Sequence, residues 1–565
     1  MPDTLTLHTR LVDLEAREVR PVTLRVAAGR IASIDPPPAG EDPEGFALPG
    51  FVDAHVHVES SMLTPAHFAA AAVAHGTVAS VSDPHEIANV CGVGGVRWML
   101  GNAASSPFKF AFGAPSCVPA TAFETAGAAL SVADVTALLN DDRVFYLSEV
   151  MNFPGVLGGD PDLLAMIAAA RERGKPVDGH APGLRGADAR AYLERGVTTD
   201  HECFTLAEAE DKLAVEGTKI LIREGSAARN FEALWPLIDR FPGRVMFCSD
   251  DKHPDELLPP AEGGWHINKL CARAVALGCD PFHTLRAACV TPVEHYGLPV
   301  GLLRVGDPAD FVVVGDLTGF AVQRTFLDGV EVAAGGVSRI APPPAEPVNR
   351  FAAGPVAASA FAVPAAEGST VAAIVPEDGQ LVTGRSDEPA AVVDGFAVAD
   401  PRRPRGGLLK LAVVNRYEPG VPPAVCFVRG FGLTRGALAG SVAHDSHNVL
   451  VVGADDASMA AAANAVIAER GGLAAHDPGP GGSGGGRTPV LPLPVAGLMS
   501  LDPVDAVAAA YLELDGLAKE MGSTLRAPFM TLSFMALLVI PALKLSDRGL
   551  FDGSAFAFTD AVSRG

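Results

Sequence analysis

Eight short apolar segments recur along the first half of the chain, and most are followed by an alanine-rich stretch with helical periodicity. They occupy residues 51–58, 77–83, 108–116, 144–150, 176–180, 197–201, 219–225 and 245–251. Strands that alternate with helices pair in parallel, and eight such units within roughly 230 residues are typical of a (β/α)8 barrel. A doubly wound open sheet is the alternative, but no Gly-x-Gly-x-x-Gly follows the first strand.

Short strands of a different kind flank these units. Residues 4–34 and 309–336 alternate apolar and polar side chains, with an Asp-Gly hairpin at 328–329. Because strands this short need more partners than either segment supplies, we expect both segments to share one domain. The predicted domains are a composite β-sandwich domain at 1–48 and 302–342, the barrel at 49–301, and a C-terminal α/β domain at 350–565.

The C-terminal domain is predicted from a change of composition after a proline-rich linker at 341–349. Strands are expected at 370–379, 391–400 and 409–417, and a helix at 457–472. The glycine-rich segment 476–489 lacks the Gly-Lys-Ser/Thr ending of a phosphate-binding loop, so a mobile loop is the favoured interpretation. The predicted barrel helices lie at 67–76, 133–142, 163–174, 187–196, 231–241 and 267–278.

The net charge of −23 argues against a nucleic-acid partner or an anionic membrane surface. Eight cysteines without paired spacings do not form a disulfide framework, so a reducing cytoplasm is the expected compartment. The N-terminus does not resemble a signal peptide. The longest apolar run, Phe534 to Leu543, is too short to span a bilayer and is predicted to be a buried segment.

Histidines and carboxylates stand at the carboxyl ends of five of the eight strands. They are His55, His57, Glu149, His180, His201, Asp250 and Asp251. A lone His-x-His pair is as often structural as functional, but all of these ends meet at one barrel mouth. Four imidazoles and two carboxylates there can bind two divalent ions if Glu149 bridges them.

Further polar residues could contribute to the same mouth. Asp83, His85 and Glu86 follow the second strand, where contact with substrate or an auxiliary metal is as plausible as a role in loop structure. Arg229 could donate to a ligand or form a salt bridge on the rim. Glu59, Glu86 and Glu202 lie just past strand ends, where capping or solvent exposure is the usual fate. The HDSHN segment at 444–448 is expected to cap a buried strand and to make interdomain hydrogen bonds, with a place in the active site as the less favoured alternative.

Several of these segments together resemble the adenine deaminases of the amidohydrolase superfamily. The similar segments are PGFVDAHVHVESSMLTP, SDPHEIANVCG, SEVMNFPGV, DGHAPGLRG, TDHECFT, KILIREGSAARN, CSDDKHPDEL, HDSHNVLVVGA, LPLPVAGLMS and LSFMALLVIPALKLSDRGLFD. The resemblance spans nearly the whole chain. It implies a metal-dependent hydrolase barrel with a composite β-domain and a C-terminal domain, and a glutamate where other amidohydrolases place a bridging lysine.

The resemblance also implies roles for individual residues. The implied metal ligands are His55, His57, Glu149, His180, His201 and Asp250, with Glu149 as the bridge. A metal-held hydroxide would attack C6 of adenine, and Asp250 would take its proton and pass it to the leaving amine. From their positions at the strand ends, Glu149 and Glu86 are the other expected catalytic residues, and His85, Glu59, Glu202 and Arg229 are the expected substrate contacts. The sequence does not choose among Glu59, Glu86 and Glu202 for the acid that protonates N1 of the purine.

The expected reaction is the conversion of adenine to hypoxanthine and ammonia, with two divalent ions as cofactors. Manganese or iron is favoured and zinc is possible, because mixed nitrogen and oxygen ligands suit all three. A deaminase of another aminopurine, a cyclic-amide amidohydrolase, and a binding protein without turnover are the alternatives. The partner is a small purine, and a homo-oligomer, plausibly a dimer, is expected.

Overall fold

The computed structural model describes residues 4–479 and 486–563, so the centre of the glycine-rich segment predicted as a mobile loop lies outside the described residues. All eight predicted parallel strands are present. They are β5 (Phe51–Val56), β6 (Thr77–Ser82), β7 (Lys109–Ala114), β8 (Val144–Val150), β9 (Val177–Gly179), β10 (Thr199–Asp200), β11 (Lys219–Arg223) and β12 (Val245–Cys248). Each strand pairs in parallel with the next within β5–β9 and within β10–β12.

Two sets of backbone contacts close these strands into a barrel. The amide of Thr198 donates to the carbonyl of Val177 at 2.8 Å, which joins β9 to β10. The amide of Asp250 donates to the carbonyl of His55 at 2.9 Å, which joins the end of β12 to β5. The predicted (β/α)8 barrel is therefore confirmed, and the carboxyl ends of its strands surround one mouth.

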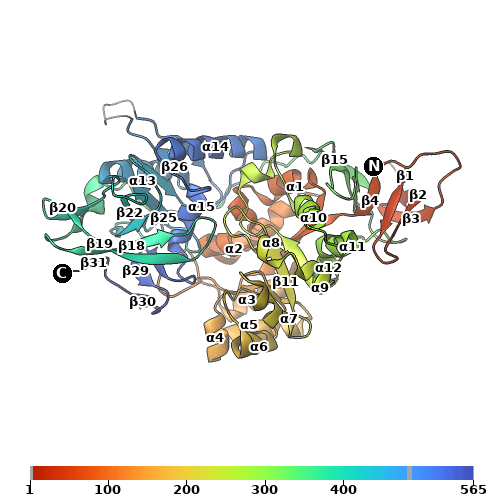
Figure 1. Cartoon of the computed structure of the whole chain (residues 1–565), viewed down its shortest axis with the longest axis horizontal. Coiled ribbons are helices and arrows are strands. Elements are labelled where there is room, and N and C mark those ends of the chain that lie inside the picture. The colour runs from red at the N-terminus through yellow and green to blue at the C-terminus, as the bar shows by residue number, and fades with distance from the viewer. Residues whose placement is uncertain (1–3, 480–485, 564–565) are drawn as a thin grey trace.

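Helices follow most of the strands, and they lie around the strands in the middle of the molecule (Figure 1). They are α1 (Pro65–Val73), α2 (His85–Ala103), α3 (Val132–Leu139), α4 (Phe153–Gly158), α5 (Pro161–Glu172), α6 (Gly186–Glu194), α7 (Leu206–Leu213), α8 (Phe231–Leu234), α9 (Leu237–Arg240), α10 (Ile267–Ala276), α11 (Pro281–Leu285) and α12 (Thr291–Tyr296). The helix expected at 231–241 is split, because Pro236 cannot donate a helical hydrogen bond.

An eight-stranded sheet, here called the composite sheet, combines the two ends of the predicted β-domain. Its order is β16-β15-β14-β13-β4-β1-β2-β3. The strands are β1 (Thr4–Asp13), β2 (Glu18–Ala27), β3 (Arg30–Asp35), β4 (Phe46–Pro49), β13 (Phe311–Val314), β14 (Val322–Leu327), β15 (Val330–Ala334) and β16 (Val337–Ser338). Asp328 and Gly329 have φ of 45° and 74° in the predicted hairpin turn between β14 and β15. The exact domain limits, 1–48 with 302–342, remain a prediction.

The C-terminal half is built on a nine-stranded sheet at the other end of the molecule (Figure 1). Its members are β18 (Thr370–Pro376), β19 (Thr383–Pro389), β22 (Leu408–Val414), β23 (Ala424–Arg429), β24 (Ala437–Gly440), β25 (Val449–Gly453), β26 (Gly472–His476), β27 (Val490–Pro492) and β31 (Val562–Ser563). Two small sheets contain β17 (Val363–Pro364), β20 (Ala391–Val393) and β21 (Phe396–Val398), and β28 (Leu543–Ser546), β29 (Gly549–Asp552) and β30 (Ala557–Phe558). The helices are α13 (Asp456–Ala468), α14 (Val504–Glu520) and α15 (Pro528–Ser533).

The C-terminal half packs against the barrel mouth. The amide of Ser500 donates to the carbonyl of Met62 at 2.8 Å, and α14 packs against residues 254–257 after β12. Most of the predicted buried segment, Phe534 to Leu543, is buried, with Phe534 and Leu537 in the core, whereas Pro541 is exposed. None of the helices within the described residues is long and apolar enough to cross a membrane.

Candidate active site

His55 and His57 project from the end of β5 toward the same point. Their Nε2 atoms are 3.2 Å apart, as expected for residues two apart on a strand. The Nδ1 atom of His57 lies 3.3 Å from the carbonyl oxygen of Asp83. If Nδ1 carries the proton and donates to this carbonyl, the lone pair of Nε2 is free to bind a cation.

Glu149, at the end of β8, stands between the histidines of the two sides of the mouth. Its Oε2 atom is 2.7 Å from Nδ1 of His180 and 3.1 Å from Nε2 of His201, while Oε1 is 3.4 Å from Nε2 of His57. Burial alone would raise the pKa of this carboxyl, but His180 and His201 hold it well below its ordinary value. The carboxylate is therefore ionised. It faces His57 on one side and His180 and His201 on the other, as a ligand shared by two cations requires.

Asp250 follows β12 with a left-handed backbone, φ 57°, which an aspartate tolerates better than most residues. This conformation accompanies the hydrogen bond from its amide to His55, and its Oδ1 atom lies 3.3 Å from Nε2 of His57. Oδ2 accepts a 2.6 Å hydrogen bond from Arg223, whose side chain also pairs with both oxygens of Glu202.

Sequence reasoning missed Arg223. It is the last residue of β11 and is 1% exposed, one of the largest fully buried side chains of the protein. The available signal was an arginine inside the apolar run KILIR, because a buried guanidinium requires carboxylate partners. Those partners are Glu202 and Asp250, which Arg223 holds at a fixed separation.

The donor set fits divalent cations. Ligand atoms about 2.1 Å from one ion lie about 3 Å apart, close to the contacts described for His57, Glu149 and Asp250. Two groups of converging ligand atoms consist of predicted ligands alone: His55, His57 and Asp250, and His55, Glu149 and His201. Two further groups combine predicted ligands with other residues: His180 and His201 with Glu202, and His57 and Glu149 with Asp83 and His85. Nδ1 of His55 and Nε2 of His180 are buried and have no hydrogen-bond partner among the described residues. Buried polar atoms of this kind require a ligand or a solvent molecule.

A small cavity of about 20 Å³ lies directly over these groups. Its barrel side is lined by His57, His85, Glu149, Met151, His180, His201, Glu202, Arg223, Asp250 and Asp251. Its other side, here called the C-terminal wall, is lined by Leu381, His444, Asp445, Phe534 and Leu537. The space accommodates about one water molecule, so a larger substrate must displace some of the side chains that line it.

The favoured interpretation of the HDSHN segment was incomplete. Asn448 does make the expected hydrogen bonds, accepting from the amide of Arg416 at 2.9 Å and donating to the carbonyl of Thr125 at 2.9 Å. However, His444 and Asp445 line the cavity. The cause is a contact between segments about 360 residues apart along the chain, a separation at which spacing in the sequence carries no information.

Glu59, Glu86 and Glu202 were expected to cap helices or face solvent; all three are fully buried, and Glu59 has a capping contact with the first turn of α2. Glu59 accepts from the amide of Ile87 at 3.2 Å, and Glu202 pairs with Arg223. Glu86 lies 2.9 Å from the hydroxyl of Ser60, which is also 2.6 Å from Oδ1 of Asp251. Burial, with the carboxyls of Glu59 and Asp251 nearby, raises the pKa of Glu86 well above its ordinary value. Of the three, only Glu202 lines the cavity.

His85 and Arg229 differ in position although both were expected to contact substrate. His85 lines the cavity, with Nδ1 3.5 Å from Oε1 of Glu149. Arg229 is not among the residues that line it; its guanidinium pairs with Glu256 at 2.8 Å and with Glu224 at 3.2 Å. The structure therefore gives Arg229 the salt bridge on the rim that was the alternative to a ligand contact.

The barrel and its buried imidazole and carboxylate groups define a metal-dependent hydrolase of the amidohydrolase kind. Residues 46–332 match the Amidohydrolase family, and residues 380–557 match the family described as Adenine deaminase C-terminal domain. The chain belongs to the adenine deaminase family.

Relatives of the same family match nearly end to end. An adenine deaminase of Salinibacter ruber is 57% identical over 561 residues, which covers 99% of both chains. An adenine deaminase of a Sulfurovum species is 51% identical over 561 residues, 99% of this chain and 100% of that one. An adenine deaminase of Methanosarcina acetivorans is 48% identical over 560 residues, 97% of this chain and 98% of that one. The family predicted from the sequence motifs is thus confirmed.

Proposed function

We propose that this enzyme deaminates adenine by hydrolysis, giving hypoxanthine and ammonia, at the cavity over Glu149 and Asp250. The observation that supports it most directly is the convergence of four buried imidazoles and two buried carboxylates in a chain of the adenine deaminase family. Purine deamination requires a nucleophilic water, a group that moves protons and a closed pocket. The cavity supplies candidates for the last two from the side chains of this chain.

Two divalent cations complete the proposed site. His55, His57 and Asp250 would hold one, His180 and His201 the other, and Glu149 would contact both. When bound, such cations supply the Lewis acidity that makes a water molecule nucleophilic at neutral pH. Manganese or iron is the proposed metal, with zinc as the alternative, because the donors are imidazole nitrogen and carboxylate oxygen.

Asp250 is the proposed proton carrier of the reaction. Its carboxylate accepts the proton of the attacking water and delivers it to the amine that leaves C6. Arg223 fixes Oδ2 at 2.6 Å, which leaves Oδ1 directed toward His57 and the cavity. The guanidinium is therefore a positioning group that fixes the orientation of the carboxylate at the cavity.

Glu86 is the proposed store for a second proton, the one that N1 of the purine receives as C6 is attacked. Burial near Glu59 and Asp251 raises its pKa well above the ordinary value, which favours the protonated carboxyl, but the carboxyl itself does not line the cavity. Ser60 connects Glu86 to Asp251, which does. We propose that the proton passes along this chain, so that Asp251 is the group in contact with the substrate.

His85 and Glu202 remain the proposed substrate contacts because both line the cavity. Glu59 and Arg229 are better assigned positioning roles: Glu59 accepts from a backbone amide in the first turn of α2, and Arg229 anchors Glu256. A cytoplasmic location and a homodimer are proposed from composition and family, not from the fold.

The metal-loaded enzyme should release ammonia from adenine with the ultraviolet change of hypoxanthine formation. Parallel incubation with N6-methyladenine and with a cyclic amide tests the other amidohydrolase reactions. Turnover of either in clear preference to adenine would contradict the proposal. Elemental analysis after expression under controlled metals identifies the ions.

A further inference from the structure

Asp445 is a buried carboxylate with one unpartnered oxygen and with two imidazoles near the other. It is 3% exposed, and its Oδ2 atom has no hydrogen-bond partner within the part of the chain that the structure describes. The nearest imidazole nitrogens to Oδ1 are Nε2 of His85 at 3.6 Å and Nδ1 of His444 at 3.8 Å, which are ion-pair distances longer than an ordinary hydrogen bond. A carboxylate in this condition is costly unless a ligand donates to it.

The position of Asp445 indicates which end of a bound purine it would contact. His85 stands between Asp445 and Glu149, since its Nδ1 is 3.5 Å from Glu149 and its Nε2 faces Asp445. Asp445 therefore lies on the C-terminal wall, separated from Glu149 by the ring of His85. A purine with C6 at the proposed metal centre would reach Asp445 only with its five-membered ring directed toward this wall.

The rest of the C-terminal wall is mostly apolar or aromatic. His444 and Phe534 stack with ring centroids 4.7 Å apart and planes 19° from parallel, and Leu381 and Leu537 complete the wall. These surfaces suit a flat heterocycle. They do not offer hydrogen bonds to replace those that the hydroxyl groups of a sugar make with water.

We infer that Asp445 accepts a hydrogen bond from the imidazole N–H of the free purine and thereby selects the base over derivatives substituted at N9. This inference rests on the proposed function. A free base carries that N–H, whereas a nucleoside or a 9-methylpurine has carbon in its place. A site with a buried acceptor rejects a ligand that lacks the matching donor, because the acceptor is left unpaired.

The test compares adenine with 9-methyladenine in matched variants. In the wild type we expect kcat/KM for adenine to exceed that for 9-methyladenine by about 10³-fold or more. Asp445→Ala should lower kcat/KM for adenine about 10²-fold and that for 9-methyladenine by less than about threefold, so that the preference collapses. Asp547→Asn is the control, because Asp547 binds Thr125 and Asn415 at the same interface without lining the cavity, and it should preserve the preference.

Asp445→Asn separates hydrogen bonding from steric exclusion. It keeps the shape but replaces the charge, so the preference should fall about tenfold, whereas exclusion by shape alone would leave it unchanged. Metal content and thermal unfolding of each variant show whether the site is intact; if Asp445→Ala does not fold, Asp445→Asn decides. An unchanged preference in the folded variants overturns the inference while adenine turnover by the wild type still supports the proposed function. If the wild type does not deaminate adenine, calorimetric binding of purine and 9-methylpurine measures the same preference independently.

Discussion

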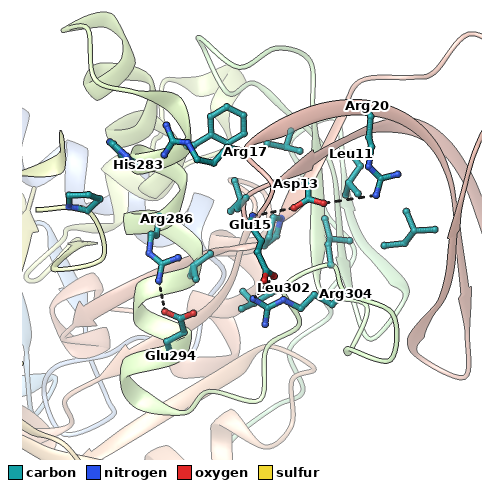
Figure 2. A pocket seen from close by; sticks show the side chains of 18 residues that line it. Leu11, Asp13, Glu15, Arg17, Arg20, His283, Arg286, Glu294, Leu302 and Arg304 are labelled. Atoms are coloured by element: carbon teal, nitrogen blue, oxygen red, sulfur yellow. Dashed lines mark hydrogen bonds and ion pairs between the residues drawn. The ribbon is translucent and has the colours of Figure 1, made fainter.

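The cavity between β1 and helices α11 and α12 has a volume of about 600 Å³, whereas the cavity at the barrel mouth has about 20 Å³. The larger one is rich in arginine, and Figure 2 shows Arg286 beside Glu294 and Arg20 beside Asp13. Its four arginine side chains, Arg17, Arg20, Arg286 and Arg304, are 40–54% exposed, and each faces a carboxylate. In the smaller cavity Glu149 and Asp250 are 3% exposed.

This difference shows that pairing and burial identify a reactive site better than volume does. Ion pairs in water contribute little and leave no donor or acceptor unsatisfied. Buried imidazoles and carboxylates without partners are unfavourable in the protein alone, so they require a bound ion or a substrate. The smaller cavity is lined by several residues with such atoms, among them His180, His444 and Asp445.

The largest expected effect is at Asp250. Asp250→Asn removes the proposed proton carrier, so kcat should fall about 10³-fold or more, while elemental analysis still finds metal. The matched change in the larger cavity is Glu294→Gln, which should leave kcat within about twofold, because it alters only an exposed pair. If the kcat of Asp250→Asn stays within tenfold of the wild-type value, the smaller cavity is not the reactive site that the comparison of the two cavities identifies.

Arg223→Lys should have the next largest effect. Lysine keeps the charge but cannot hold Glu202 and Asp250 together as the planar guanidinium does, so kcat should fall about 10- to 100-fold with metal content unchanged. Arg244→Lys is the control, because Arg244 donates only to backbone carbonyls at the opposite end of the barrel. A loss of metal in Arg223→Lys would assign Arg223 to the construction of the site instead.

Lys544 provides a pH-dependent test of burial behind the C-terminal wall. Its ammonium donates to the carbonyls of Leu381 and Phe534, and burial lowers its pKa to about 7. The unfolded chain, in which this pKa is about 10.4, therefore binds more protons between pH 7 and pH 10. The free energy of unfolding therefore rises with pH across that window, because the cost of burying Lys544 is largest near pH 7 and diminishes as the unfolded chain loses its proton.

Denaturant midpoints measured from pH 7 to pH 9.5 for wild type and Lys544→Met reveal this contribution. The wild type should gain up to a few kcal/mol relative to the variant as pH rises. Lys269→Met, at an exposed position on α10, should show the same profile as wild type. Parallel profiles for wild type and Lys544→Met would show that Lys544 does not have a lowered pKa.

The smallest expected effect belongs to the arginines of the larger cavity. Arg286→Ala and Arg304→Ala each break one exposed ion pair and should change the free energy of unfolding by less than about 1 kcal/mol. Turnover should stay within about twofold. A loss of turnover in either variant would mean that the two cavities are coupled.

The sequence predicted the barrel and its mouth for a simple physical reason. Parallel strands direct their carboxyl ends to one side, so the positions of His55, Glu149, His180, His201 and Asp250 along the chain imply that they meet. The same reasoning does not predict that α2 begins at His85, because the glycines of VCGVGG are typical of a loop. One of them, Gly92, does interrupt the helix, with φ 61°.

Contacts between distant segments account for the other omissions. Arg223 lies within an apolar strand, and only its partners on neighbouring strands reveal why an arginine is there. The C-terminal wall brings Leu381, His444 and Phe534 to the barrel mouth from segments that carry no periodic signal for it. The local pattern of apolar and polar residues predicts individual helices and strands. It does not predict which surfaces of the two halves of the chain pack together, because residue spacing carries no information about contacts between distant segments.

Anomalous diffraction from a manganese-loaded crystal tests the central claim most directly. The account predicts two peaks per chain, about 3.5–4 Å apart, with the carboxylate of Glu149 in contact with both. A single peak, or peaks that lie on Glu86, His444 and His447 instead of the six predicted ligands, would contradict it.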